Sequence, residues 1–150
     1  MNLLEEILQG DSWLVAAHTA DVHVTIEELR SSCLKEGIAA YTWYFDKGLV
    51  SVREQGFSVP GTVRISDAMR YVKQSPHFGI YIFPEVTSQF FRQLTQLSHF
   101  LHRKKGQEKR VVLVGDNLQI PVGIEAEVSH LTVHTQEQLM PRLRDGKWVL

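Results

Sequence analysis

Apolar residues along the chain fall into two kinds of pattern, which alternate about five times. Nearly continuous apolar runs occur at residues 13–17, 79–83 and 110–115, and residues 128–133 form a last, less apolar strand pattern. Runs of this kind are typical of strands covered on both faces, as in the middle of a parallel sheet. Between them, apolar residues recur at the spacing of amphipathic helices. The alternation predicts an α/β fold, a three-layer sandwich in which helices cover both faces of a mainly parallel five-stranded sheet.

The run at 79–83 predicts the interior strand of that sheet. It is followed directly by Pro84 and Glu85. Open α/β sheets bind their ligands outside the carboxyl ends of the strands, where nucleotide-handling sheets usually hold acidic residues for magnesium. Only one acid of the usual pair is present here. Glu85 is therefore a candidate site residue, and Pro84 stands where the other acid would be.

Local signals predict where the helices begin and end. Thr25 and Glu28 form a capping box, which predicts a helix that begins at Thr25 and ends at Gly37. Ser66 is the expected cap of another helix. A helix after Thr87-Ser88 is expected from the apolar residues Phe90, Leu94, Leu97 and Leu101, and a last one from Thr135 through Leu139 and Leu143.

A hairpin is expected at one edge of the sheet. Residues 38–45 are rich in strand-favouring side chains, and Asp46-Lys47-Gly48 is a turn that leads into the alternating residues 49–53. Aromatic side chains gather in its first arm, and such side chains anchor protein interfaces when they are partly exposed. The interface candidates are Tyr41, Trp43, Tyr44 and Phe45, with core filling as the alternative interpretation.

Composition narrows the class of protein. A chain of 150 residues is the size of one domain, so residues 1–150 are expected to share one core. The 16 basic and 17 acidic residues nearly cancel, which gives no general attraction to nucleic acid or to an anionic membrane. No apolar run approaches the roughly 20 residues of a membrane span. The single cysteine, Cys33, cannot form an internal disulfide, which fits a reducing cytoplasm.

The connection after the first strand is the natural phosphate site of such a sheet, because a helix N-terminus presents free N–H groups. A phosphate-binding loop needs glycines, a lysine and a hydroxyl for magnesium. Between Ala17 and Thr25 there is neither glycine nor lysine, Val24 stands at the lysine position, and only the Thr25 hydroxyl remains. The sequence therefore lacks a Walker A motif at this place.

Three segments carry a resemblance to a known family. They are Tyr41-Thr42-Trp43, Ile80-Tyr81-Ile82-Phe83 at the Walker B position, and Val111-Val112-Leu113-Val114 followed by Ile120-Pro121. With these the chain resembles the N-terminal domain of AAA-type ATPases of the chloroplast-reading-frame kind. The resemblance implies a P-loop-NTPase-like fold without a Walker A motif, that is, a degenerate P-loop-like domain that precedes a true ATPase module. It also places Asn117 where such ATPases keep a polar sensor residue.

Histidines are the remaining candidates for chemistry. His99 and His102 are three residues apart in a predicted helix, but no third ligand is evident. His130 and His134 lie on a predicted strand, where four residues span roughly 13 Å, too far for one ion. Neither a metal site nor a cofactor is predicted.

Two functions from different classes stay open. The first is a non-catalytic module that regulates or assembles an AAA-type ATPase through protein contacts, with that ATPase or another copy of itself as partner. The second is a nucleotide-binding protein or hydrolase with an atypical phosphate site. Its residues would be His18, Asp21, Thr25, Glu85 and Asn117. The first is favoured, because loss of the lysine and glycines removes both charge neutralisation and close backbone approach to phosphate.

Overall fold

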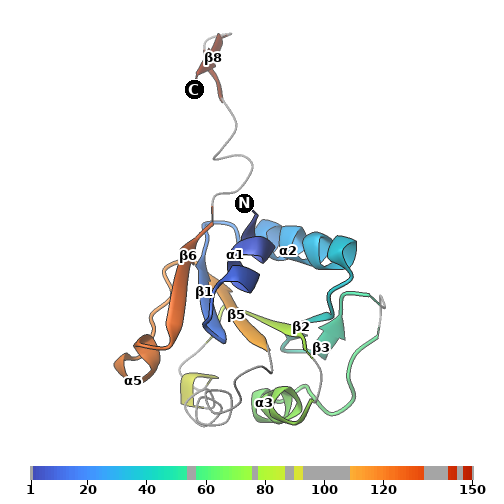
Figure 1. Cartoon of the computed structure of the whole chain (residues 1–150). Coiled ribbons are helices and arrows are strands. Elements are labelled where there is room, and N and C mark those ends of the chain that lie inside the picture. Colours follow the sequence, from blue (N-terminus) through green and yellow to red (C-terminus); the bar gives the residue numbers. More distant parts are fainter. Residues whose placement is uncertain are drawn as a thin grey trace.

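A six-stranded mixed sheet forms the centre of the protein (Figure 1). The computed structural model describes residues 2–53, 57–75, 78–86, 90–92, 109–133, 142–144 and 147–149. The strands lie in the order β3-β2-β4-β5-β1-β6. Their bounds are β1 Leu14–His18, β2 Ala40–Tyr44, β3 Gly48–Ser51, β4 Ile80–Pro84, β5 Arg110–Gly115 and β6 Val128–Thr132. All neighbours pair in parallel except β2 and β3, which are antiparallel.

Helices cover both faces of this sheet. Helices α1 (Leu3–Gln9) and α2 (Val22–Glu36) pack on one face, and α3 (Ile65–Gln74) packs on the other (Figure 1). The short helix α5 (Val122–Glu125) contributes Ile124 to the second face. Because the strands are apolar on both sides, each face has its own hydrophobic core, and the predicted α/β class is confirmed.

Strand β4 lies in the interior of the sheet, as its apolar run predicted. It pairs with β2 on one side and with β5 on the other. Ile80 and Ile82 are 0% exposed and belong to the core under α1 and α2, while Tyr81 and Phe83 belong to the core under α3. Successive side chains of a strand point to opposite faces, so this run fills both cores at once.

The predicted number of five strands was wrong, because the second arm of the hairpin joins the main sheet. Strand β3 pairs with β2 as an antiparallel edge strand and makes the sheet mixed. Gly48 begins this strand with a left-handed φ of 79°. A Cβ there would lie 2.5 Å from the Thr62 hydroxyl, which receives the Leu49 N–H and donates to the Val59 carbonyl. The hairpin is thus tied to the following loop at a position that only glycine fits.

Helix α2 begins three residues earlier than predicted. Its N-cap is Asp21, whose carboxylate accepts the Val24 N–H at 3.1 Å, so the expected cap Thr25 lies inside the first turn. The C-terminus is as predicted: Gly37 is left-handed, and its N–H returns to carbonyls of the last turn. Two capping signals stand four residues apart in the sequence, and the earlier one begins the helix.

Two further helix predictions were wrong at their described residues. Helix α3 begins at Ile65 with Arg64 as its N-cap and without a side-chain capping bond, so Ser66 lies within the helix. Leu143 belongs to β7 (Arg142–Arg144), which pairs with β8 (Lys147–Val149) in a separate antiparallel sheet, and not to a helix. Of the helix expected after Thr87-Ser88, residues 90–92 are helical and Phe90 is buried. Thr87, Ser88, Leu94, Leu97, Leu101, Thr135 and Leu139 lie outside the described residues.

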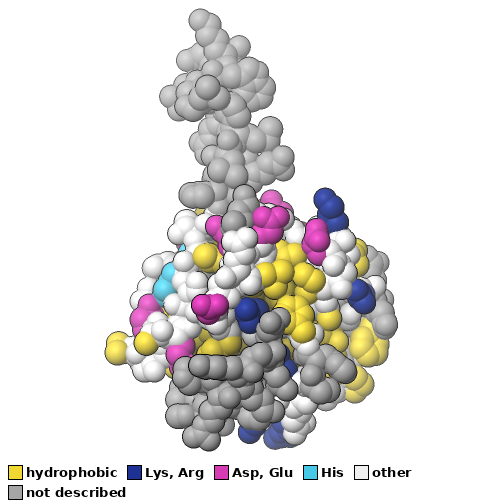
Figure 2. All heavy atoms as spheres, in the orientation of Figure 1, with side chains coloured by type: hydrophobic (Ala, Val, Ile, Leu, Met, Phe, Trp, Pro, Cys, Tyr) yellow, Lys and Arg dark blue, Asp and Glu magenta, His cyan; other side chains and the backbone are white. Residues whose placement is uncertain are grey.

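Charges on the described surface are mixed in sign. On the face seen in Figure 2, acidic and basic side chains lie interspersed among hydrophobic ones. Several surface pairs combine both signs, including Arg30 with Glu27 at 2.8 Å and Arg70 with Asp67 at 3.4 Å. Among the described residues, no helix has the length and apolar character needed to cross a membrane.

Candidate functional site

The carboxyl ends of the parallel strands form the edge where a site is expected. Strand β1 lies between β5 and β6. The chain leaves β1 towards β2 on one side, whereas it leaves β5 towards β6 on the other. Such a reversal of direction is the topological switch point at which open α/β sheets bind ligands. His18 ends β1, Glu85 follows β4 and Asn117 follows β5, so three of the predicted residues lie along this edge.

The connection from β1 to α2 is short and bonded to itself. Thr19 donates its backbone N–H to the Gly115 carbonyl, and its buried hydroxyl receives the Asp21 N–H at 3.2 Å and the Thr25 hydroxyl at 2.7 Å. Thr25 is 1% exposed. The Thr25 hydroxyl, which a phosphate-binding loop would direct at magnesium, is therefore used inside the protein.

The N-terminus of α2 is occupied by a carboxylate of the chain itself. Asp21 accepts the Val24 N–H, and a negative group at this end also interacts favourably with the helix dipole. An incoming phosphate would meet that negative charge and would find the Val24 N–H already bonded. The anion site at the start of α2 is filled by the protein's own side chain.

Glu85 and Asn117 line one cleft of about 800 Å³ at the ends of β4 and β5. Both have left-handed backbones, with φ of 49° and 55°. Among the described residues, they are the two non-glycine residues with a positive φ. This conformation costs on the order of 1 kcal/mol for a residue such as Glu, and it clusters at binding sites. The remaining wall is apolar with a few polar groups: Val86, Phe91, Leu118, Ile120 and Pro121 beside Arg92, Asp116 and Gln119.

Glu85 also borders a second cleft of about 540 Å³ between β2, β4 and the start of α2. This cleft is mainly apolar. Its described lining includes Val22, His23, Ile26, Trp43, Tyr44, Phe45, Ile65, Pro84, Val86 and Phe90. The structure thus brings Glu85 and Asn117 together, whereas His18, Asp21 and Thr25 are not among the described residues that line either cleft.

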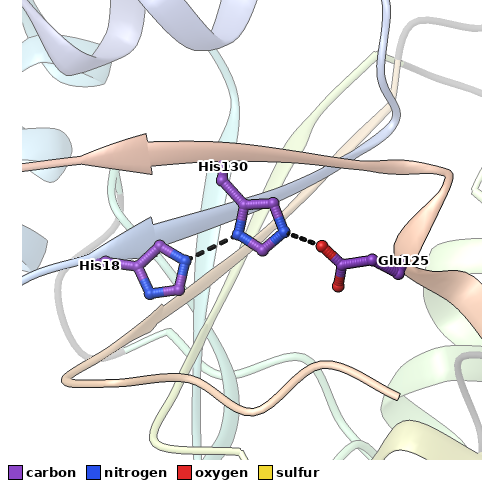
Figure 3. Close-up of polar contacts among 3 residues, drawn as sticks. All are labelled: His18, Glu125 and His130. Carbon is purple, nitrogen blue, oxygen red and sulfur yellow. Dashed lines mark hydrogen bonds and ion pairs between the residues drawn. The ribbon is translucent and has the colours of Figure 1, made fainter. Parts of the chain in front are cut away.

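His18 instead contacts a histidine from the neighbouring edge strand. Its Nε2 lies 2.8 Å from Nδ1 of His130 on β6, and Nε2 of His130 lies 2.5 Å from Oε1 of Glu125 at the end of α5 (Figure 3). Partial burial lowers the pKa of His18 below its ordinary value of 6.5; His130 lowers it further and Glu125 opposes both. The three side chains form a chain of hydrogen bonds that joins α5 to β6 and β6 to β1.

The four interface candidates differ in exposure. Tyr41 stacks on Tyr81 with ring centroids 5.4 Å apart, and Trp43 donates its indole N–H to the Thr62 carbonyl, so both pack against the core under α3. Tyr44 is half-buried. Phe45 is 80% exposed at the tip of the hairpin.

Comparison with known proteins identifies the family. A family model described as the N-terminal domain of SpoVK-like AAA ATPases matches residues 1–133. The chain belongs to this family. No curated protein and no solved structure matches the chain. The resemblance to the N-terminal domain of AAA-type ATPases is therefore confirmed, and membership associates the chain with such ATPases.

The family match covers every part of the site in this SpoVK-like domain. It spans α1 to β6, and therefore includes Asp21, Glu85, Asn117 and the pair of His18 with His130. Sequence reasoning missed the contribution of His130 and Glu125, which lie over 100 residues after His18. It also missed Arg92 in the cleft beside Glu85. Only the register of β6 against β1 reveals the histidine pair, and one sequence carries no signal for that register.

Proposed function

We propose that this SpoVK-like N-terminal domain is a non-catalytic module with a degenerate P-loop-like fold that regulates or assembles an AAA-type ATPase through protein contacts. The observation that carries the proposal is the Asp21 carboxylate at the start of α2. In a working phosphate-binding loop this place belongs to the phosphates. We also assign the domain to AAA-type ATPases of the chloroplast-reading-frame kind, on the three segments that carry the resemblance.

The charges and the hydrogen bonds at the connection from β1 to α2 both argue against ATP hydrolysis there. Phosphoryl transfer needs cations around the transferred group, and losing such a group typically costs several kcal/mol of transition-state stabilisation. The connection at residues 19–21 supplies a carboxylate instead of a lysine, and its one hydroxyl, that of Thr19, receives the Thr25 hydroxyl of α2. Glu85 alone remains of the acidic pair that would hold magnesium.

The surface proposed for contacts is the hairpin tip and the apolar cleft beside it. Phe45 is exposed, and Tyr44 and Trp43 continue from it into the cleft. Aromatic side chains next to an apolar cleft are typical anchors of protein interfaces. The partner is an AAA-type ATPase module or a second copy of the domain, and neither nucleic acid nor a membrane is proposed. The unpaired thiol of Cys33 favours a reducing compartment such as the cytoplasm.

The proposal is tested by isothermal titration calorimetry with ATP and magnesium. We expect no saturable heat at millimolar nucleotide and no phosphate release above background. Magnesium-dependent turnover that Glu85→Gln abolishes would contradict the proposal and would favour an atypical hydrolase.

A second candidate function is nucleotide binding without the usual loop. It is favoured by the left-handed Glu85 and Asn117, which share the larger cleft. In that case ATP binds in the calorimeter, Asn117→Ala weakens it, and Asp21→Asn has little effect because Asp21 lies outside the described lining.

A further inference from the structure

The contact between His18 and His130 is edge to edge. The ring centroids are 5.1 Å apart and the planes differ by only 14°, while the facing nitrogens are 2.8 Å apart. Rings stacked face to face would have no nitrogens in line in this way. The rings instead lie nearly in one plane, and the two facing nitrogens point at each other (Figure 3).

Glu125 determines where the protons of this pair sit. An ionised carboxylate only accepts hydrogen bonds, so Nε2 of His130 carries a proton towards Glu125. In a neutral imidazole the other nitrogen is then an acceptor. Nδ1 of His130 therefore presents a lone pair, and Nε2 of His18 donates its proton to it. A single proton separates two nitrogens that are both metal-binding atoms.

We propose that His18 Nε2 and His130 Nδ1 together bind one divalent transition-metal ion of the zinc class, with Glu125 orienting His130. Histidines that bind metals usually donate their other ring N–H to a carboxylate, which fixes the tautomer and makes the ligand nitrogen more basic. Glu125 and His130 already have that arrangement. His130 binds in its present tautomer, and the proton of His18 moves from Nε2 to Nδ1 through solvent, so no net proton or electron is gained or lost.

Binding requires a small shift of the two nitrogens and a turn of the two rings. Two zinc–nitrogen bonds at a tetrahedral angle hold the nitrogens about 3.3 Å apart, about 0.5 Å more than the present 2.8 Å. The two nitrogens now point at each other, so the rings must also turn until both lone pairs aim at the ion. His130 is 40% exposed and His18 is only half-buried, so both rings have room to turn, and Glu125, 48% exposed, can follow His130.

Water completes the coordination. The described residues contain no group of three or more His, Cys, Asp or Glu side chains placed to hold one ion, and Glu125 contacts the far nitrogen of His130. The ion is thus exchangeable. Because its two ligands come from β1 and β6, it would also fasten the edge strand β6 to the sheet.

Titration of the full chain with Zn²⁺ in a calorimeter tests the site, and Co²⁺ absorption provides a second readout. We expect one ion per chain, with affinity reduced at least tenfold by His130→Gln or His18→Gln. Glu125→Gln keeps the shape but removes the charge, and we expect a loss of about 10- to 100-fold, as for other carboxylates that orient metal-binding histidines. We also expect Zn²⁺ to raise the Tm of the wild-type chain but not that of His130→Gln.

The matched control is the double variant His99→Gln and His102→Gln, which removes the two histidines that lie nearest each other in the sequence. We expect it to bind Zn²⁺ as the wild type does. Binding that survives His130→Gln, binding that the double variant abolishes, or no saturable binding by the wild type at millimolar Zn²⁺ would each overturn the proposal. Circular dichroism of the His130→Gln chain separates lost binding from lost folding.

Discussion

Asp21 and Thr25 show how side chains within one turn of each other take different roles. Asp21 caps α2 from outside, while Thr25 turns inward and bonds to Thr19. Both are residue types that cap helices, but only the Thr25-Glu28 pair matched the capping box, so Thr25 was the predicted cap. Which residue caps the helix depends on burial of the Thr25 hydroxyl against the end of β1, and that is a tertiary contact no local pattern records.

Replacing Asp21 separates the capping bond from the charge. Asp21→Ala removes the acceptor of the Val24 N–H, and we expect the free energy of unfolding to fall by about 1 kcal/mol. Asp21→Asn keeps an acceptor and is the control, expected to stay close to wild type. Urea denaturation measures both. Equal losses in the two variants would mean that the charge, and not the bond, stabilises the helix.

Cys33 gives a pH dependence with a definite sign. Burial raises the pKa of its thiol from about 9 to about 11, so the folded chain holds this proton more tightly than the unfolded chain. The stability from this proton is therefore complete below about pH 9 and is lost as the pH rises towards 11.

Comparison with Cys33→Ala isolates this effect. Between pH 9 and pH 11 we expect the free energy of unfolding of the wild type to fall relative to that of Cys33→Ala, measured by urea denaturation at each pH. The pKa of Tyr81 is also raised, chiefly by burial, but Tyr81 is present in both chains and cancels in the difference. A difference that stays constant with pH would contradict the assignment.

At the scale of elements, continuous apolar runs were the most reliable signals. They located β4 and β5, because strands buried on both faces need apolar residues at every position. The last predicted helix, which rested on the helical spacing of Leu139 and Leu143, was wrong at Leu143, its described residue. Asp145-Gly146, a two-residue hairpin signal, stands between the segments that form β7 and β8, and it was the better guide.

Lys109 joins two elements that the sequence does not link. It is 1% exposed just before β5, and its Nζ donates to the Val72 carbonyl at 2.6 Å and the Lys73 carbonyl at 3.3 Å, in the last turn of α3. A buried cation at a helix C-terminus satisfies carbonyls that have no partner within the helix.

Lys109→Met keeps the aliphatic stem and removes these donors. We expect the chain to lose about 1 to 3 kcal/mol of stability, because buried carbonyls of α3 lose a charged partner. Lys35→Met, at an exposed position in the last turn of α2, is the control and should change stability by less than about 0.5 kcal/mol. A Lys109→Met chain as stable as the control would show that water replaces the ammonium.

For the whole molecule, the sequence predicted the fold class and the edge of the sheet that carries the clefts. The position of Glu85 followed from the rule that ligands lie beyond the carboxyl ends of parallel strands, whereas Asn117 was placed by the family resemblance. The pairing of His18 with His130 could not be predicted, because it needs β1 and β6 to lie side by side in one register. The exposure of a side chain such as Phe45 could not be predicted either, because it depends on how the helices and the sheet pack together.

Phe45→Glu tests the proposed contact surface with little risk to folding. The ring is 80% exposed, so we expect stability within about 0.5 kcal/mol of wild type. Loss of an aromatic anchor should weaken association at least tenfold. Sedimentation at several concentrations measures self-association, and co-elution with a SpoVK-like ATPase module measures the other partner.

Val122→Glu is the matched control for that test. Val122 is 93% exposed on α5, outside the described lining of both clefts. We expect it to associate as the wild type does. A wild-type chain that stays monomeric and binds no ATPase module would remove the basis for this surface, as would equal weakening by both variants.

The place of β1 in the sheet has a consequence for synthesis of the protein. Among the strands of this sheet β1 is synthesised first, yet both of its neighbours, β5 and β6, follow about a hundred residues later. At translation rates of about 5 to 20 residues per second, its two open edges wait roughly 5 to 20 seconds for a partner. The hairpin of β2 and β3 meets no such delay. In the nascent chain, β1 is therefore the strand most exposed to chaperone binding, proteolysis and aggregation, until β5 and β6 have been synthesised and pair with it.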